Sequence, residues 1–399
     1  MLSTTAKPAS ATGPTIVDVA IVGAGPAGGA AALELAQGGL SVVVIEKAVL
    51  PRYKTCGGGV LWRAAKLLPV DISPAVDRDC HTAELVHHAP DLRFACARPH
   101  PLIRMVMRDR FDALLVTAAQ QRGGVALATG TVVQRVVPRA DAVELVTDRG
   151  TFAAQFVIAA DGVNSVVARQ TDRPALRNIV PALECEARYP DEVFQRFGGT
   201  ARFDFGLVPA GYGWVFPKRE HLSIGVGTTR RGAANLPAEY ERYLSKLELA
   251  RAEGEERHGY MIPCHPRAGL FELPRILFVG DAAGLADPVT AEGISAGIIS
   301  GQLAARAIVA ARDDASRAQR RYRSALEAAL LRDLRVARTL AWLLYERPRW
   351  CAALLQRHGA GMSELMTRIV AGETTYRAAV SRPAHYVRLL LRRRERVAA

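Results

Sequence analysis

The chain has 399 residues, of which 49% are hydrophobic and 23% are charged, and its formal net charge is +13. This composition is typical of a folded globular protein and excludes a disordered chain. The sequence has no uninterrupted apolar run of about 18 residues, and its first residues lack the basic flank and apolar core of a signal peptide. We therefore expect a cytoplasmic protein with a frayed N-terminus.

The cysteines are scattered along the chain and form no CxxC pair. Their positions are Cys56, Cys80, Cys96, Cys185, Cys264 and Cys351. This spacing predicts free thiols rather than a disulfide framework, and it gives no sign of a metal site.

The first predicted elements form a βαβ unit: a strand at residues 16–21, a glycine-rich turn and helix at 22–40, and a buried strand at 41–47. The turn reads GAGPAG, with glycines at Gly23, Gly25 and Gly28. These glycines permit the tight turn, the approach of a pyrophosphate and close helix packing, in that order. The N-terminus of the helix attracts phosphate. Glu46, which ends the second strand, can accept hydrogen bonds from ribose hydroxyls. The pattern therefore predicts FAD or NAD and disfavours NADP.

The later elements follow in order. Residues 61–102 predict loops and short strands, 108–119 a helix, 130–137 a strand, and 143–162 a hairpin. Residues 175–270 alternate apolar residues with prolines and glycines, which predicts an antiparallel sheet in a second domain. A buried strand and glycine turn at 276–284 lead into a small-residue helix at 292–311. Arg-rich helices follow from residue 312, with breaks expected near Pro348, Gly359 and Pro383.

Two later strand ends carry aspartates, in Ala160-Asp161-Gly162 and in LFVGD, which ends at Asp281. FAD is longer than one mononucleotide site, so further strand ends must reach its ribityl chain and ring. Asp281 is placed to bind a ribityl hydroxyl. The helix after Gly293 directs its positive end toward the reduced ring, which favours FAD over a nicotinamide cofactor.

These elements predict an α/β fold with three parts: a Rossmann-like FAD-binding domain, an antiparallel β-sheet substrate domain and a C-terminal helical region. The expected FAD-binding segments are 16–75, 105–174 and 271–311. The expected substrate-domain segments are 76–104 and 175–270, and the basic helical region covers 312–399.

The motifs GAGPAGGAAA, ADG and GDAAGLADPVTAEGI resemble the para-hydroxybenzoate hydroxylase-like flavoprotein superfamily over most of residues 16–310. Within it, PRYKTCGGGV, GYGWVFPK and LSIGVGT resemble the geranylgeranyl reductase family. The resemblance implies reduction of isoprenoid double bonds with FAD and an external electron donor, NAD(P)H or reduced ferredoxin. It implies flavin contacts at Glu46, Cys56, Gly57, Gly58, Gly59, Arg108, Val132, Asp281, Gly293 and Ile294. Neighbouring residues of these motifs complete the predicted cofactor site: Ala27, Lys47, Asp161, Gly162, Gly280 and Pro288.

Two of these residues leave alternatives open. The glycine loop is expected to pass beside the flavin ring, where a Cβ would clash. Cys56 is then either a redox or proton-transfer partner, made more acidic by Arg52 and Lys54, or a small buried hydrophobe. Arg108 is expected to span phosphate oxygens with two nitrogens, and Arg110 is the alternative.

An apolar stripe is predicted at residues 211–217. Tyr212, Trp214 and Phe216 alternate along a strand and so share one face, which predicts a substrate channel. Tyr212 and Trp214 join Cys56 as candidate catalytic residues, and simple core packing is the alternative interpretation of the stripe.

The C-terminal region is strongly basic, with 19 arginines and 8 acidic residues after residue 311. Its amphipathic helix at 332–350 presents Trp342, Tyr345 and Trp350, which suits peripheral binding to the inner, anionic face of a membrane. A coding bias toward arginine, or a helix that simply covers the domain, are the alternatives.

The leading hypothesis is an FAD-dependent reductase that saturates double bonds of a geranylgeranyl or other isoprenoid chain on a lipid, quinone or pigment. The alternatives are an FAD-dependent aromatic-ring monooxygenase and, in another class, a flavin-containing lipid-binding or sensor protein. No nucleic-acid partner is expected, and the oligomeric state stays open.

Overall fold

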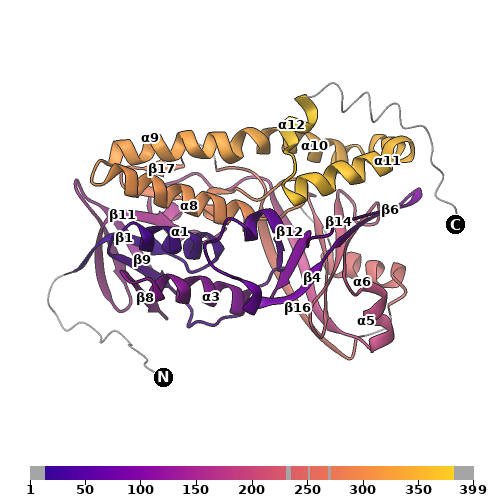
Figure 1. Ribbon diagram of the computed structural model, residues 1–399, viewed down its shortest axis with the longest axis horizontal. Helices are drawn as coiled ribbons and strands as arrows, with labels where there is room; N and C mark the ends of the chain where they lie inside the picture. Colours follow the sequence, from indigo (N-terminus) through magenta and orange to yellow (C-terminus); the bar gives the residue numbers. More distant parts are fainter. Residues whose placement is uncertain (1–13, 231–234, 250–251, 268–270, 382–399) are drawn as a thin grey trace.

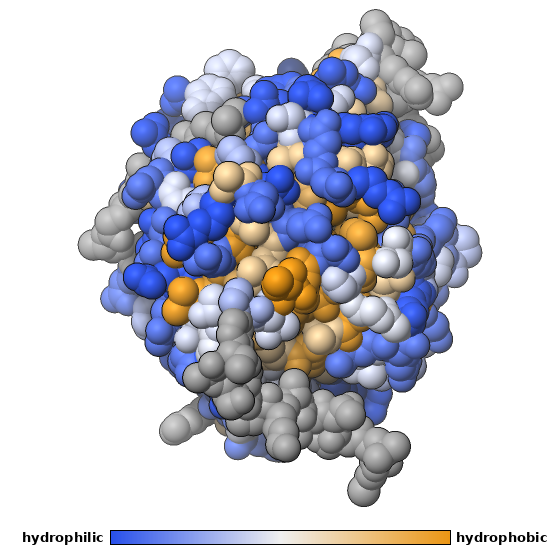
Figure 2. All heavy atoms as spheres, turned by 90° about the vertical axis from the view of Figure 1, so that its left-hand side faces the viewer, coloured by the Kyte–Doolittle hydropathy of each residue, from blue (hydrophilic) through white to orange (hydrophobic). Residues whose placement is uncertain are grey.

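The computed structural model describes residues 14–230, 235–249, 252–267 and 271–381. Two large sheets lie side by side, and long helices of the C-terminal region run along one side of both (Figure 1). The face at the left end of that view is covered mostly by hydrophilic side chains, with apolar side chains gathered near its centre (Figure 2).

An eight-stranded sheet forms the centre of the first part, in the order β17-β18-β11-β1-β2-β8, with β10 paired to β11 and β9 paired to β10. Five strands run parallel: β1 (Thr15–Val22), β2 (Val42–Glu46), β8 (Val125–Thr129), β11 (Gly150–Ala159) and β18 (Ile276–Phe278). The others are β9 (Val133–Pro138), β10 (Val143–Thr147) and β17 (Glu272–Leu273). Parallel strands covered on both faces read as continuous apolar runs, which is why the sequence revealed them.

Three helices pack closely with this sheet: α1 (Pro26–Gln37), α3 (Arg108–Gln121) and α8 (Ile294–Ala311). α8 is long and apolar enough to cross a membrane by length and composition, but 72% of it is buried inside the protein. It therefore belongs to the core that it forms with α1. This mostly parallel sheet with its layer of packed helices confirms the predicted Rossmann-like α/β fold.

A seven-stranded sheet forms the second part, in the order β16-β12-β15-β14-β13-β5-β6. Its strands are β5 (Thr82–His88), β6 (Asp91–Ala97), β12 (Ile179–Arg188), β13 (Thr200–Phe205), β14 (Gly211–Pro217), β15 (Leu222–Thr228) and β16 (Gly254–Pro263). The pairing is antiparallel except between β5 and β13, which run parallel because β5 enters from a distant part of the chain. One face packs on α5 (Asp191–Phe197) and α6 (Leu236–Lys246), two helices that the sequence did not predict.

Smaller elements connect the two sheets. A three-stranded sheet consists of β3 (Gly59–Leu61), β4 (Val76–Cys80) and β7 (Ile103–Val106). The short helices are α2 (Trp62–Ala65), the 3-10 turn η1 (Ser73–Ala75), α4 (Val166–Gln170) and α7 (Gly280–Ala283).

The C-terminal helices are α9 (Ala315–Leu326), the π-helical turn η2 (Glu327–Leu331), α10 (Arg332–Glu346), α11 (Pro348–Ala371) and α12 (Tyr376–Ser381). The predicted break at Pro348 is present, since α11 begins there. The predicted break near Gly359 is confirmed: the backbone leaves the helical conformation at His358, with a φ of −135°, so two helical segments meet at a kink within α11. Gly359 lies against the ring of Phe94 on β6, so it serves close packing. Pro383 lies outside the described residues.

Candidate functional site

A cavity of about 810 Å³ lies between the two large sheets. Its wall combines the β1–α1 turn, the ends of β2, β11 and β18, the glycine loop at 51–59, the N-terminus of α8, and one face of the seven-stranded sheet. A volume of this size is in the range of cofactor and ligand sites. Parts of the chain that are far apart in sequence thus meet around one space.

The glycine turn closes one end of the cavity. Gly23 has a φ of +102°, and a Cβ there would lie 2.4 Å from the carbonyl oxygen of Ala160. At Gly25 a Cβ would have, among the described residues, only Arg108 within 4 Å, so the backbone faces open space at the positive end of α1. Gly28 does not line the cavity. It lies inside α1, where a Cβ would meet the Gly23 carbonyl oxygen at 1.9 Å.

Glu46 is fixed beside this turn. Its carboxylate accepts hydrogen bonds from the backbone N–H groups of Ala24, at 2.8 Å, and Ala48, at 3.1 Å. Only 4% of the residue is exposed, and it lines the cavity together with Lys47 and Val132. A carboxylate held in this way keeps an oriented acceptor at the end of β2.

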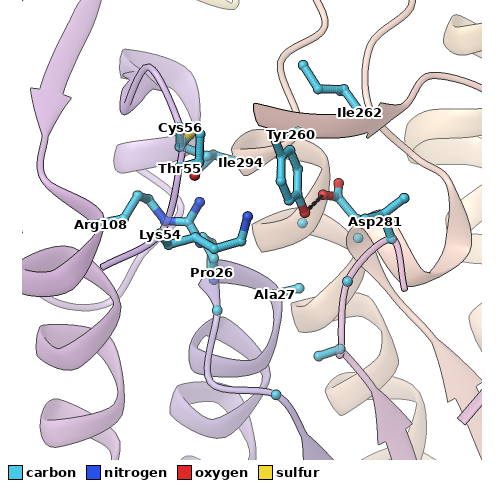
Figure 3. A pocket seen from close by; sticks show the side chains of 18 of the residues that line it. Pro26, Ala27, Lys54, Thr55, Cys56, Arg108, Tyr260, Ile262, Asp281 and Ile294 are labelled. Carbon is cyan, nitrogen blue, oxygen red and sulfur yellow. Dashed lines mark hydrogen bonds between the residues drawn. The ribbon is translucent and has the colours of Figure 1, made fainter. Parts of the chain in front are cut away.

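Two aspartates lie at the ends of the neighbouring strands. Asp161 Oδ2 accepts a hydrogen bond from Val167 N, but its buried Oδ1 has no partner among the described residues. Asp281 accepts a hydrogen bond of 3.2 Å from the Tyr260 hydroxyl (Figure 3). Burial raises the pKa of both carboxyls. Both residues therefore offer oxygen atoms to the cavity.

Lys54 is a cavity residue that the sequence does not identify as part of the site. Its Nζ lies 3.2 Å from the centre of the Tyr260 ring. Burial, followed by the positive charge of Arg108, lowers the pKa of Lys54 to about 8. Figure 3 shows the Lys54 and Arg108 side chains extending into the same space above Pro26, the first residue of α1. Two cations at a helix N-terminus suit an anionic ligand.

Arg108 is held by a carboxylate within its own helix. Its Nε and Nη2 each lie 2.9 Å from an oxygen of Asp112. Burial lowers the pKa of Arg108, but the charges of Asp112 and Cys56 outweigh it and raise the pKa overall. Asp112 occupies the Nε–Nη2 edge of the guanidinium, so the predicted two-nitrogen phosphate contact would have to use the Nη1–Nη2 edge. The alternative, Arg110, pairs with Asp77 and does not line the cavity.

The glycine loop is fixed by a lysine from the other domain. Lys218, which is 1% exposed, donates hydrogen bonds from Nζ to the carbonyl oxygens of Gly57, at 2.6 Å, and Val106, at 2.9 Å. Gly58 has a φ of +66°, and its N–H donates to Cys56 Sγ at 3.4 Å. Cys56 is partly buried and lines the cavity. All six cysteines are free, as predicted.

The aromatic stripe of β14 faces the cavity. Tyr212, Trp214 and Phe216 all line it, and their ring centres lie 5.9 and 6.3 Å apart in sequence order. The Tyr212 hydroxyl donates to the carbonyl oxygen of Thr290 at 2.5 Å. The same rings also pack against the C-terminal helices. The stripe therefore lines the cavity and is also part of a hydrophobic core.

Small residues on the adjacent strand β15 make room for these rings. Leu222, Ile224 and Val226 pack into the core beneath the sheet, so the residues between them point to the cavity face. Gly225 lies opposite Trp214, and a Cβ there would lie 2.1 Å from the indole carbon Cζ2. The indole therefore lies flat over the β15 backbone.

Glu184 is a cavity residue that the sequence analysis missed. It is 3% exposed and lies on β12, opposite Gly225. Ser223 Oγ donates to its Oε1 at 2.5 Å, and Oε2 has no partner among the described residues. Burial raises the pKa of Glu184. The segment ALECEAR would have been read as a strand with a solvent face at its glutamates, so no local signal marks this residue.

The structure brings most of the predicted site residues together, and two lie elsewhere. Those that line the cavity are Gly23, Gly25, Ala27, Glu46, Lys47, Cys56, Gly57, Gly58, Gly59, Arg108, Val132, Asp161, Gly162, Tyr212, Trp214, Phe216, Gly280, Asp281, Gly293 and Ile294. Besides Gly28, Pro288 is the exception: it borders a separate small pocket with Tyr345, so its predicted cofactor contact is not supported.

FAD fits the residues present. The Gly25 backbone is open to a pyrophosphate, and the oxygen of Asp161 without a partner is a free acceptor within the same cavity. The positive N-terminal end of α8, at Ile294, lines the wall beside Gly293. FAD is an elongated ligand with anionic, hydroxylated and flat apolar parts, and these parts match the groups that line the cavity.

Comparisons with known proteins agree with this site. A family model described as an FAD binding domain matches residues 16–182. Digeranylgeranylglycerophospholipid reductase 1 of Methanopyrus kandleri is 32% identical, with 82% of this chain and 91% of that protein covered. The chloroplastic geranylgeranyl diphosphate reductase of Oryza sativa is 32% identical over 73% of this chain, which spans 66% of that longer relative.

The fold is also similar to that of solved structures. A geranylgeranyl bacteriochlorophyll reductase-like protein from Thermoplasma acidophilum superposes with a TM-score of 0.73 at 21% identity, covering 95% of this chain and 97% of the other. The flavin-dependent brominase Bmp2 superposes with a TM-score of 0.71 at 19% identity, covering 94% of this chain and 100% of the other. These likenesses establish the fold that several flavoenzyme activities share.

Proposed function

The chain belongs to the geranylgeranyl reductase family of FAD-dependent oxidoreductases, and we propose that it saturates carbon–carbon double bonds of a geranylgeranyl or other isoprenoid chain. The carrier of that chain is a lipid, quinone or pigment. One observation supports the proposal above the others: the cavity that begins at the glycine turn ends against an apolar wall of Tyr212, Trp214 and Phe216.

In this proposal, one half of the cavity binds the cofactor and the other half binds the substrate. Glu46 binds the adenosine ribose, the Gly25 backbone binds the pyrophosphate with help from Arg108, and Asp281 binds the ribityl chain. The N-terminus of α8 stabilises the negative charge of the reduced ring. FAD, when bound, supplies the hydride for the reduction, with NAD(P)H or reduced ferredoxin as the proposed source of electrons.

In the proposed substrate half, the cavity wall holds the isoprenoid chain by its shape and excludes water. An isoprenoid double bond is not polarised, so its reduction needs a hydride donor and an acid held together with water excluded. The aromatic stripe supplies an apolar surface, and Cys56 on the Lys218-braced loop lies beside it. A monooxygenase for a small aromatic acid would need polar groups to orient its substrate, and this wall offers few.

The test is anaerobic turnover. The purified protein, loaded with FAD and photoreduced, is mixed with geranylgeranyl diphosphate or a geranylgeranylated lipid. We expect reoxidation of the flavin together with product that has gained two hydrogen atoms per double bond. Reoxidation that needs oxygen and adds an oxygen atom to an aromatic compound would instead establish the hydroxylase. Flavin that no isoprenoid reoxidises would leave the binding or sensor protein.

We also propose a membrane contact at the junction of α10 and α11. Trp342 is 51% exposed and Trp350 is 67% exposed, and Arg347 and Arg349 between them are exposed as well. Tryptophan and arginine together suit the headgroup region of an anionic bilayer, where an isoprenoid lipid would be collected. Tyr345, which was expected to join this surface, is buried and donates to the carbonyl oxygen of Val289.

A further inference from the structure

The cavity holds an acidic group to which no role has been given. Glu184 is 3% exposed, it lines the cavity, and no ion pair with it is formed among the described residues within 4 Å. A buried carboxyl without a cation in contact is costly to keep ionised. Its presence in an otherwise apolar wall therefore needs a chemical reason.

The hydrogen bonds around Glu184 have a fixed direction. Trp214 Nε1–H can only donate, and it donates to Ser223 Oγ at 3.4 Å. Ser223 then uses its own proton to donate to Glu184 Oε1 at 2.5 Å. Oε1 is thus an acceptor, so a proton on this carboxyl would sit on Oε2, the buried oxygen that has no partner among the described residues. The chain of donors begins at the aromatic stripe and ends at an acid.

From this arrangement we propose that Glu184 is the general acid of the reaction, which protonates the alkene carbon that does not receive the hydride. This inference rests on the proposed reductase function. The indole of Trp214 lies over Gly225, the residue that separates Trp214 from Glu184 across the sheet. A prenyl chain packed on the indole is therefore one strand away from the acid.

The reaction balances with groups already named. Reduced FAD gives a hydride, with its electron pair, to one carbon of the double bond. The Oε2–H bond of Glu184 breaks and its proton forms a C–H bond at the other carbon, while the π bond is lost. FAD is left oxidised and Glu184 is left as a carboxylate, which takes a proton from water after the product departs.

The surroundings of Glu184 favour its protonated form before the reaction. Burial raises its pKa, whereas Ser223 and the charge of Lys218 act in the opposite direction. Lys218 is itself directed at two backbone carbonyls, and burial lowers its pKa. The backbone N–H of Cys56 on the glycine loop also lowers the pKa of Glu184. The other titratable groups near this carboxyl are His258 on β16, Tyr53 on the glycine loop, and Glu186 on β12. Lys218 can pair electrostatically with the carboxylate once the proton has left.

The experiment compares Glu184→Gln with the wild-type holoenzyme. Gln keeps the shape and the acceptor for Ser223 but holds no acidic proton. In single turnovers of the photoreduced enzyme with a geranylgeranyl compound, we expect the rate at saturating substrate to fall about 100-fold. The visible spectrum of bound FAD and the substrate dissociation constant should stay close to wild type.

Glu186→Gln is the matched control. It removes the same type of side chain two residues along the same strand face, but Glu186 does not line the cavity. Its turnover rate should be unchanged. A second readout does not depend on activity: the infrared spectrum of the wild-type protein near pH 7 should contain the carbonyl stretch of a protonated carboxyl that shifts in D₂O and disappears in Glu184→Gln.

The outcomes separate this inference from the function on which it rests. Wild-type enzyme that reduces isoprenoids, together with Glu184→Gln that does so equally fast, overturns the role of Glu184 and leaves the reductase standing. The same holds if the carboxyl stretch is missing, or if Cys56→Ser abolishes turnover while Glu184→Gln does not. Wild-type enzyme that reduces no isoprenoid overturns both.

Discussion

The Nζ atom of Lys218 lies 2.6 Å from the carbonyl oxygen of Gly57, so an ammonium that follows β14 of the seven-stranded sheet holds the glycine loop at 51–59. A second bond, to the carbonyl oxygen of Val106, fixes the strand behind that loop. The two domains are therefore joined at the place where flavin and substrate are expected to meet.

Lys218→Met should loosen this loop. Two buried carbonyl oxygens lose a charged donor, which costs about 2 kcal/mol of unfolding free energy. We expect a lower urea midpoint and weaker retention of FAD on gel filtration. Lys246→Met, on the exposed side of α6, is the control and should change neither measurement. Unchanged FAD retention in Lys218→Met would show that the loop is held by other contacts.

Gly225→Ala should impair alkene reduction without weakening FAD binding. The added Cβ would lie 2.1 Å from the Trp214 ring, so the indole must leave its place on β15. We expect alkene reduction to slow about ten-fold, since misplacement of a positioning group costs at least that much, while the FAD dissociation constant is unchanged. Gly254→Ala is the control, because no atom of the described residues lies within 4 Å of the added Cβ. Wild-type turnover in Gly225→Ala would remove Trp214 from the channel.

Glu46→Ala should weaken FAD binding. The carboxylate is held by Ala24 N and Ala48 N, and its loss removes the proposed acceptor of the ribose hydroxyls. Hydrogen bonds to a charged group contribute about 1.5 to 3 kcal/mol, so the dissociation constant should rise at least about ten-fold. Fluorescence titration of the flavin-free protein measures this. Glu144→Ala, on the hairpin strand β10, should bind FAD as the wild type does.

Glu292 should make the stability of the flavin-free protein depend on pH. Burial raises its pKa from 4.5 to about 7. The folded state then binds the proton more tightly than the unfolded state, so this contribution to stability is complete below about pH 4.5 and is lost as the pH rises to about 7. Unfolding free energies of wild type and Glu292→Gln, measured at pH 5 and pH 8, should show a smaller loss in the variant. An equal loss in both proteins would contradict this assignment.

Trp342→Ala combined with Trp350→Ala should reduce membrane binding. Both rings are exposed, and the loss of two interfacial aromatic side chains should lower vesicle partition by about ten-fold or more. Flotation with anionic liposomes measures this, and binding of the wild type should weaken with salt because Arg347 and Arg349 flank the rings. Ile16→Ala, an exposed apolar residue on β1, is the control. Flotation of the double variant equal to wild type would remove this surface from membrane contact.

Local patterns in the sequence determined the parts of the site that a single segment specifies. The glycine turn, Glu46 at a strand end and the alternation of Tyr212, Trp214 and Phe216 each depend on the period of one strand or one turn. Such periods are written in neighbouring residues, so the Rossmann-like unit, the aromatic face and the helix after Gly293 could all be predicted.

Only the tertiary structure decided which of these segments meet, and what surrounds each charge. From the sequence, Glu184 is expected to face solvent. In the folded protein, the glycine loop, which is far away in the sequence, covers its face of the strand. Asp112 holds the Nε–Nη2 edge of Arg108, and Lys54 enters the cavity beside Tyr260. Burial and pairing depend on contacts between distant segments, which no local period encodes, and in this protein those contacts set the charge of the site.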